Sequence, residues 1–225
     1  MVALDGPRIA PKSGQAKQLV VFLHGRGANG DDLIELGYQW QGLLPDAAFA
    51  APDASLPCEG APMGREWFPL TFRDPTELWR GVQEAAPALN AFLDAELARY
   101  GLDDTKLALV GFSQGTMMAL HVGLRRATAP AGILGFSGLL VLQADKGPES
   151  LKEQVKTKPP ILLTHGDRDE ILPIEMFFFS KETLAAAEIP CQWHLSAGVG
   201  HGIDAGALHH GGLFLTQSFG LPYPQ

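Results

Sequence analysis

Short apolar runs alternate with longer segments of helical periodicity along the whole chain. The compact apolar runs are typical of buried strands and cover residues 18–25, 47–54, 106–112, 131–138, 159–167 and 191–198. The segments with helical periodicity cover residues 31–44, 74–101, 115–126, 174–188 and 202–219. Runs that are apolar throughout, each followed by a helix, indicate parallel strands covered on both faces. The pattern therefore predicts an α/β fold with a mostly parallel, doubly wound sheet and helices on both faces.

The predicted helix at residues 74–101 carries the clearest boundary signals. Asp74 suits its N-cap, Pro75 its first turn and Glu77 the capping-box position. Gly101 is expected to end this helix, and Pro87 is the candidate position for a kink inside it.

The carboxyl ends of the predicted strands are the expected location of a binding site. In an open parallel sheet, ligands bind outside those ends. The loops that follow Leu23, Phe112, Phe136, Thr164 and Ser196 should therefore converge on one face of the molecule.

Composition and charge narrow the class of protein. The 225 residues, 46% of them hydrophobic, are enough for a single domain over residues 1–225. The formal net charge of −8 disfavours nucleic acid and anionic lipid as partners. Cys58 and Cys191 form no disulfide framework and are interpreted as reduced thiols. The sequence has neither a signal peptide nor a run close to the ~20 apolar residues that span a bilayer, so a soluble cytoplasmic protein without membrane insertion is expected.

The segment GFSQG, residues 111–115, lies where a predicted strand meets a predicted helix. It fits the pattern G-x-S-x-G, in which a tight turn holds the serine in a strained conformation with its Oγ exposed at the top of the sheet. Side chains at Gly111 and Gly115 would clash in such a turn. This context favours Ser113 as a nucleophile over a plain glycine-flanked turn.

A serine nucleophile needs a base, and the base needs an acid that orients it. In this architecture the chain order is Ser, then Asp or Glu, then His. The acid candidates follow the strand at 159–167 and are Asp167, Asp169 and Glu170. Asp167 directly follows a glycine and is expected to bond the turn backbone, whereas Asp169 can reach across to a histidine loop. Asp169 is therefore the favoured acid.

His201 is the favoured base, because it lies in the glycine-rich loop GVGHGID after the last predicted strand and can swing over the serine. His165 ends a strand and is interpreted as a structural neighbour of the turn that carries Asp169, called the acid turn below. His194 lies inside a strand, where it packs or faces solvent. The other histidines of interest lie in predicted helices and are His121, His209 and His210. No set of His, Cys and Asp residues has a spacing typical of a metal site.

An acyl-transfer site also needs hydrogen-bond donors for the oxyanion. The backbone N–H of Gln114, directly after the nucleophile, is one candidate. The backbone N–H of Arg26, in the loop LHGRGANGDD, is the second. Only the backbone atom is used, so replacement of the Arg26 side chain need not abolish activity.

Two apolar segments could shape a substrate pocket. Trp67 lies in the aromatic segment EWFPLTF, and Leu139 lies in the apolar segment SGLLVL just beyond a strand. Apolar walls with few polar groups are the norm for small-molecule sites. These two residues either wall an acyl groove or are buried in the core.

Six motifs resemble, in their order along the chain, the phospholipase/carboxylesterase family of α/β-hydrolases, which includes the acyl-protein thioesterases. They are FLHGRGANGDD, REWFPL, GFSQGTMMAL, GFSGLL, THGDRDEILP and GVGHGI. The resemblance covers nearly the whole chain and implies an α/β-hydrolase fold with a minimal cap, activity on carboxylic esters or thioesters, and no cofactor. It places nucleophile, acid and base on Ser113, Asp169 and His201, and the oxyanion donors on the backbones of Arg26 and Gln114. Many members have leucine where Arg26 stands, so this chain places a charge near the mouth of the site.

Residues and resemblance together predict a serine carboxylesterase that hydrolyses short-to-medium acyl esters through an acyl-enzyme, without cofactor or metal. An acyl thioesterase or lysophospholipase with the same three residues is the alternative, and a non-catalytic binding protein is a more remote one. A dienelactone-type hydrolase is disfavoured, because position 113 holds serine rather than cysteine. The expected partner is a small-molecule ester or thioester, and the expected oligomeric state is a monomer or a modest homodimer.

Overall fold

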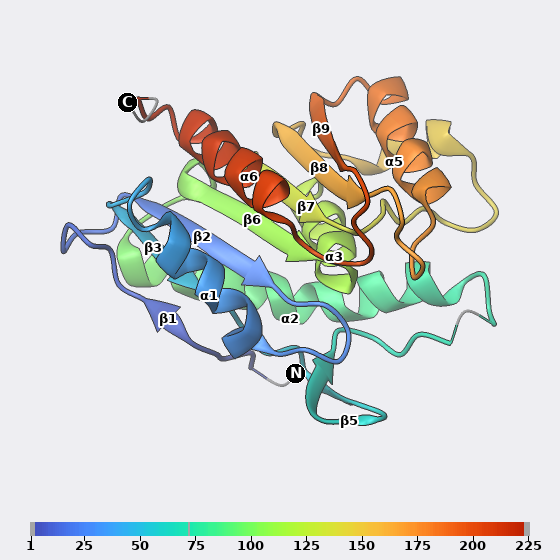
Figure 1. Ribbon diagram of the computed structural model, residues 1–225, viewed down its shortest axis with the longest axis horizontal. Helices are drawn as coiled ribbons and strands as arrows, with labels where there is room; N and C mark the ends of the chain where they lie inside the picture. Colours follow the sequence, from blue (N-terminus) through green and yellow to red (C-terminus); the bar gives the residue numbers. More distant parts are fainter. Residues whose placement is uncertain (1–2, 72, 223–225) are drawn as a thin grey trace.

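A seven-stranded sheet forms the centre of the protein (Figure 1). The structure is a computed structural model that describes residues 3–71 and 73–222. The strands of the sheet are β1 (Arg8–Ile9), β2 (Gln18–Leu23), β3 (Ala47–Ala50), β6 (Leu107–Phe112), β7 (Gly132–Phe136), β8 (Ile161–Gly166) and β9 (Cys191–Ser196). Their spatial order is β1-β3-β2-β6-β7-β8-β9, and each neighbouring pair except β1–β3 is parallel.

Helices cover both faces of this sheet, which confirms the predicted α/β architecture (Figure 1). One face is covered by α1 (Gly30–Trp40) and α6 (Ala205–Ser218). The other face is covered by α2 (Glu77–Tyr100), α3 (Gln114–Gly123) and α5 (Ile174–Ala186). The remaining elements are the short helices α4 (Leu151–Gln154), η1 (Asp104–Lys106) and η2 (Pro148–Ser150), and an antiparallel hairpin of β4 (Leu56–Cys58) and β5 (Ala61–Glu66).

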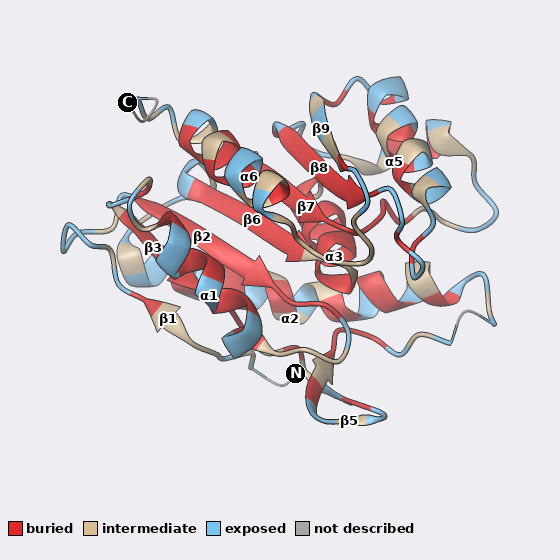
Figure 2. Ribbon diagram, viewed as in Figure 1, coloured by how far each residue is buried: buried red, intermediate tan, exposed pale blue. Residues whose placement is uncertain are grey.

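The strand β2 shows why the central strands are largely apolar. All its residues are buried. Leu19 and Val21 pack into the cluster beneath α2 and α3, while Val20 and Phe22 pack into the cluster beneath α1 and α6. Successive side chains of a strand point to opposite faces, so a strand covered twice leaves no position for a solvated side chain. Figure 2 shows the same burial along the neighbouring strands.

The start of α2 differs from the sequence prediction. Its N-cap is Thr76 rather than Asp74, so the predicted start is wrong by two residues. Asp74 instead stabilises the turn before the helix, where its Oδ1 accepts hydrogen bonds from the N–H and hydroxyl of Thr76 at 2.8 and 2.7 Å. Gly101 ends the helix in the left-handed conformation as expected, with φ 66°. The helix continues through Pro87.

Two features inferred from composition can be compared with the structure. Cys58 and Cys191 are both free thiols, as predicted. Within residues 3–71 and 73–222, no helix combines the length and apolarity needed to cross a bilayer.

The first turn of α3 packs against the end of β2 with no room for a side chain. A Cβ on Gly115 would collide with the carbonyl oxygen of Leu23, and a Cβ on Gly111 would collide with the backbone of Gly115 and Thr116. Leu23 and Gly111 are paired across β2 and β6, so these contacts meet at one point of the sheet edge. The two glycines therefore allow the tight turn between β6 and α3.

Gly115→Ala is expected to lower the free energy of unfolding by about 2–4 kcal/mol, because the added methyl group must displace backbone rather than a flexible side chain. Gly42→Ala is the control, since Gly42 is exposed and an added Cβ there meets nothing. The control should change stability by less than about 0.5 kcal/mol. Urea denaturation followed by circular dichroism measures both, and equal effects would contradict the packing described.

Candidate active site

Ser113 lies between the end of β6 and the first turn of α3. Its backbone has φ 53° and ψ −117°, a region that non-glycine residues rarely occupy. Its N–H donates to the carbonyl of Phe136 at 2.9 Å, and its carbonyl accepts from the N–H groups of Thr116 and Met117 at 3.0 and 3.3 Å. Such strain persists only where the surrounding structure enforces it. The neighbouring strand β7 and helix α3 therefore fix the position of the serine.

His201 contacts Ser113 from the loop between β9 and α6. Its Nε2 lies 3.0 Å from Ser113 Oγ, and its Nδ1 lies 2.8 Å from Asp169 Oδ2. The imidazole also packs on the ring of Phe112, with the centroids 5.0 Å apart. Because an ionised carboxylate only accepts hydrogen bonds, His201 Nδ1 carries the proton and Nε2 presents a lone pair to the serine hydroxyl.

Asp169 is buried at the turn between β8 and α5, with its side chain 0% exposed. Its Oδ1 accepts from the N–H groups of Ile171 and Leu172 at 2.9 and 2.8 Å. Burial alone raises the pKa of this carboxyl. Hydrogen bonds from Leu172, His201 and Ile171 outweigh burial, so the pKa lies below its usual value. The turn therefore holds Asp169 ionised while it orients His201.

The other two acid candidates form no hydrogen bond with His201 in the described structure. Asp167 is exposed, and its Oδ1 accepts from the N–H of Gly198 at 2.6 Å. Glu170 is also exposed. Among the three carboxyl groups that follow β8, only Asp169 contacts His201 in the described structure. The structure thus brings together the three residues that the sequence favoured.

Two backbone N–H groups beside Ser113 have no hydrogen-bond acceptor among residues 3–71 and 73–222. They belong to Arg26, in the loop after β2, and to Gln114, at the start of α3. The two loops lie against each other, since a Cβ on Gly25 would come within 3.2 Å of Ser113 Cβ. Unpaired N–H groups at a helix N-terminus attract negative charge. Both N–H groups are thus free to bind an oxyanion.

The Arg26 side chain turns to the β4–β5 hairpin. Its Nε donates to Glu66 Oε2 at 2.7 Å, and the Glu66 side chain is only 8% exposed. The hairpin is also joined to this loop through its backbone, by bonds from Gly27 N–H to Arg65 O and from Arg65 N–H to Ala28 O. The charge expected near the mouth of the site is therefore paired.

Trp67 and Leu139 are both buried, at 3% and 6% exposure. The Trp67 indole N–H donates to the carbonyl of His24 at 2.9 Å, and Trp67 also lines a cavity of about 190 Å³ with Phe68. Leu139 packs into the apolar cluster that contains Phe177. Their contact with an acyl group stays a prediction.

The side chain of Gln114 forms a buried clamp that the sequence did not reveal. Its Oε1 accepts from Trp67 N–H and its Nε2 donates to Phe68 O, both at 2.8 Å. Ser137 was also missed. It has φ 43°, and its Oγ donates to Gly202 O at 3.1 Å beside His201. The Ser-Gly pair directly after the apolar strand β7 is the sequence signal that could have revealed this turn.

His165 lies beneath the acid turn, as the sequence suggested. Its Nε2 is 2.8 Å from the carbonyl oxygen of Leu172 and 3.4 Å from Asp169 Oδ2. Its ring stacks on Phe177 with centroids 5.4 Å apart. His194 and His210 face each other across β9 and α6 at 4.4 Å, away from the serine. In the described part of the chain, no group of three or more His, Cys, Asp or Glu residues is arranged to hold a metal ion.

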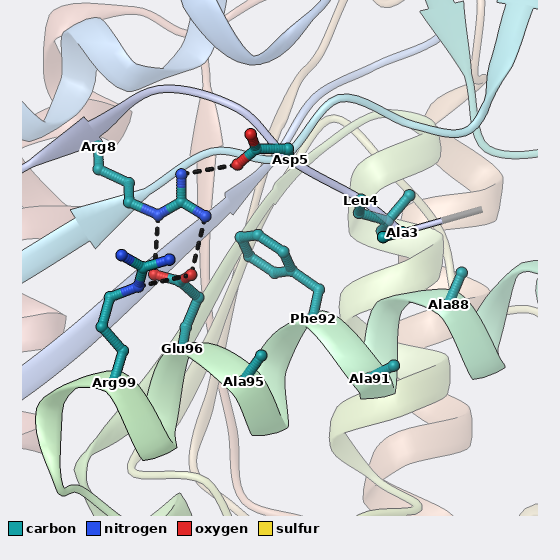
Figure 3. A pocket seen from close by; sticks show the side chains of 10 residues that line it. All are labelled: Ala3, Leu4, Asp5, Arg8, Ala88, Ala91, Phe92, Ala95, Glu96 and Arg99. Carbon is teal, nitrogen blue, oxygen red and sulfur yellow. Dashed lines mark hydrogen bonds and ion pairs between the residues drawn. The ribbon is translucent and has the colours of Figure 1, made fainter. Parts of the chain in front are cut away.

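A cavity of about 520 Å³ lies away from Ser113, between the N-terminal segment and α2 (Figure 3). Its lining residues are Ala3, Leu4, Asp5, Arg8, Ala88, Ala91, Phe92, Ala95, Glu96 and Arg99. Arg8 donates to both Asp5 and Glu96, and Arg99 donates to Glu96. The charged groups are thus paired with one another, and the described lining residues include no serine, threonine, cysteine or histidine. The hydrogen-bonded set around Ser113 is the candidate active site.

Known proteins match this chain over most of its length. The family model described as Phospholipase/Carboxylesterase matches residues 4–217. Acyl-protein thioesterase 1 of Schizosaccharomyces pombe is 33% identical over 162 residues, 68% of this chain and 69% of the relative. Esterase YpfH of Escherichia coli is 26% identical over 189 residues, 84% of this chain and 78% of the relative.

Solved structures with the same fold also match this chain. The crystal structure of esterase PE8 matches with a TM-score of 0.90 and 42% identity, covering 96% of this chain and 99% of that chain. Arabidopsis thaliana SOBER1 matches with a TM-score of 0.78 and 23% identity, covering 89% and 98%. At 23% identity, the match to SOBER1 supports only the fold.

Gln114→Met keeps the backbone N–H of residue 114 but leaves Trp67 N–H and Phe68 C=O without partners. We expect the free energy of unfolding to fall by about 2–4 kcal/mol, because each buried unpaired group costs about 1–3 kcal/mol. Hydrogen exchange of the Trp67 amide should accelerate in the folded protein. Unchanged stability together with unchanged protection of that amide would show that the clamp does not hold the segment.

Proposed function

Since the chain belongs to the phospholipase/carboxylesterase family of α/β-hydrolases, we propose that it is a serine carboxylesterase acting as a single domain over residues 1–225. The observation that carries the proposal is the continuous hydrogen-bonded set from Asp169 through His201 to Ser113 Oγ. The substrate class is a carboxylic ester with a short-to-medium acyl group.

Acylation begins at Ser113. His201 Nε2 accepts the hydroxyl proton while Oγ attacks the carbonyl carbon of the ester. Asp169 keeps the imidazole in the required tautomer and stabilises the imidazolium that forms. His201 then returns the proton to the leaving alcohol oxygen, and the acyl group remains bonded to Ser113 Oγ. The 3.0 Å separation of His201 Nε2 and Ser113 Oγ supports direct proton transfer.

The tetrahedral intermediate carries its negative charge on the former carbonyl oxygen. The unpaired N–H groups of Arg26 and Gln114 are proposed to donate to this oxygen. Donors that are already oriented need no rearrangement during the reaction, and a single one is worth about 10²–10³ in kcat. In the second half-reaction a water molecule gives its proton to His201 and attacks the acyl carbon. The acid leaves and Ser113 Oγ is protonated again.

The surroundings of the site favour short-to-medium acyl groups. The five longer helices of the described part, α1, α2, α3, α5 and α6, pack on the two faces of the sheet, so we expect no helical lid over Ser113. Each methylene contributes about 0.8 kcal/mol only when it is removed from water. Ile171, two residues beyond Asp169, is 54% exposed and offers apolar surface for the first carbons of a chain. Trp67 and Leu139 are the proposed inner walls.

An acyl thioesterase is the second candidate, and a lysophospholipase would use the same residues. The thioesterase is favoured by the similarity to Acyl-protein thioesterase 1 of Schizosaccharomyces pombe, at 33% identity. The chemistry at Ser113 is the same for both, because only the leaving atom changes from oxygen to sulfur. The leaving group therefore decides between them.

Ser113→Ala is expected to lower kcat for p-nitrophenyl butyrate by more than about 10⁴-fold, and Asp169→Asn by about 10³–10⁴-fold. Asp167→Asn is the matched control, since it removes a carboxylate two residues away that bonds Gly198 rather than His201. The control should keep most of the wild-type rate. Circular dichroism establishes that each variant is folded. An active Ser113→Ala, or a control as impaired as Asp169→Asn, would contradict the proposed roles.

Among p-nitrophenyl acetate, butyrate and octanoate, we expect the two shorter esters to give the higher kcat/KM, because without a lid the far end of an octanoyl chain would stay in water. A matched pair of butyryl oxyester and butyryl thioester of the same leaving-group size tests the leaving atom. We expect the oxyester to be hydrolysed at least as fast. A thioester preference above about 10-fold, a difference of 1.4 kcal/mol in transition-state stabilisation, would replace the carboxylesterase by the thioesterase.

A further inference from the structure

The buried imidazole of His24 contacts the loop that carries the first oxyanion donor. We infer that His24 is a positioning residue, which aims the backbone N–H of Arg26 at the oxyanion by holding the carbonyl of the same peptide. This inference rests on the proposed function, because it assigns a task to a residue that does not itself touch the substrate.

Both ring nitrogens of His24 have backbone partners, and these fix the tautomer. The ring is buried, with the residue 1% exposed. Nε2 lies 3.0 Å from the N–H of Ala54, which can only donate, so Nε2 is the bare nitrogen. Nδ1 lies 2.8 Å from the carbonyl of Gly25, which can only accept, so Nδ1 carries the proton.

The carbonyl of Gly25 belongs to the same peptide unit as the N–H of Arg26. A peptide unit is planar and trans, so its C=O and N–H point in opposite directions. A hydrogen bond that holds the oxygen on one side therefore fixes the direction of the N–H on the other. The N–H of Ala28 also donates to Gly25 O, at 3.2 Å, so the oxygen is held from two directions. The Arg26 N–H on the opposite side of the peptide has no acceptor among the described residues, which is consistent with this arrangement.

The same contacts join the two oxyanion donors. The carbonyl of His24 accepts the indole N–H of Trp67 at 2.9 Å, and the two rings lie 5.5 Å apart. The backbone N–H of Trp67 donates to the side chain of Gln114, whose own N–H is the second donor. A carbonyl that accepts a hydrogen bond also makes the N–H of its peptide a stronger donor, because hydrogen bonds in a chain polarise one another. His24 therefore acts on both the direction and the strength of the Arg26 N–H.

Electrostatics around the ring is consistent with this arrangement. Burial lowers the pKa of His24, outweighing the opposing effects of the Gly25 carbonyl and of the carboxylates of Asp53 and Asp32, while Arg65 lowers it further. The imidazole therefore stays neutral and keeps its lone pair on Nε2 for Ala54.

Two variants of His24 distinguish the role of the hydrogen bond at Nδ1 from that of the hydrogen bond at Nε2. In His24→Asn the amide nitrogen can occupy the place of Nδ1, so the donor to Gly25 O is retained and the acceptor for Ala54 N–H is lost. In His24→Gln the amide reaches the place of Nε2, so the acceptor is retained and the donor is lost. Each variant thus loses one buried hydrogen bond, and their stabilities should be similar. Only His24→Gln is expected to impair the oxyanion donor.

We expect His24→Gln to lower kcat for p-nitrophenyl butyrate by about 10- to 100-fold, part of the loss seen when an oxyanion donor is removed, with KM almost unchanged. Its affinity for butylboronic acid, whose tetrahedral adduct with Ser113 mimics the intermediate, should fall by the same factor. His24→Asn should keep most of both. Equal losses in the two variants, or losses in KM rather than kcat, would overturn the inference.

A measurement on the unmodified protein covers the case in which a variant fails to fold. The ¹⁵N shifts of the imidazole distinguish the two tautomers, and the inference requires Nδ1–H on His24. A proton on Nε2 would overturn it. Failure of the proposed function has a different signature, because wild-type protein would then hydrolyse no ester and Ser113→Ala would change nothing. If the wild type is active and both His24 variants keep its kcat, the positioning role is overturned while the proposed function stands.

Discussion

The close approach of α3 to the sheet is the constraint on which the whole site depends. Gly115 leaves so little space beside the Leu23 carbonyl that the chain must turn sharply at Ser113. The turn is closed on its other side by the bond from Ser113 N–H to Phe136 O. The serine is thus located by the ends of three adjacent strands, and its oxygen points to the edge where the neighbouring loops meet.

Buried polar contacts, rather than apolar packing, fix the loops around that point. The acid turn is closed on Asp169 by two backbone N–H groups, and the loop after β2 is held by His24 and by the hairpin through Arg65. A buried polar group left unpaired costs more than its bond contributes, so such networks select one arrangement sharply. This explains how loops without regular structure hold atoms at hydrogen-bonding distance in a site that is partly open to water.

The six parallel strands, the five longer helices and the order Ser113, Asp169, His201 could be predicted because each depends on local pattern. Apolar runs and glycine punctuation are properties of a few neighbouring residues, and chain order follows from the architecture. The hairpin β4–β5 was missed because two prolines and a glycine interrupt its alternation. The partners of Gln114 and His24 could not be predicted, since they depend on which loops meet in space. The start of α2 was misplaced because Asp74 favours a turn as readily as a helix cap.

The backbone of Ser113 has a consequence for how such a chain can change over generations. A non-glycine residue in this conformation costs of order 1–3 kcal/mol, a cost that glycine does not carry. The most stable residue at this position is therefore one that has no hydroxyl at all. Selection for robustness alone would remove the nucleophile, and only selection for turnover retains it. At Ser113, selection for stability and selection for activity therefore favour different residues.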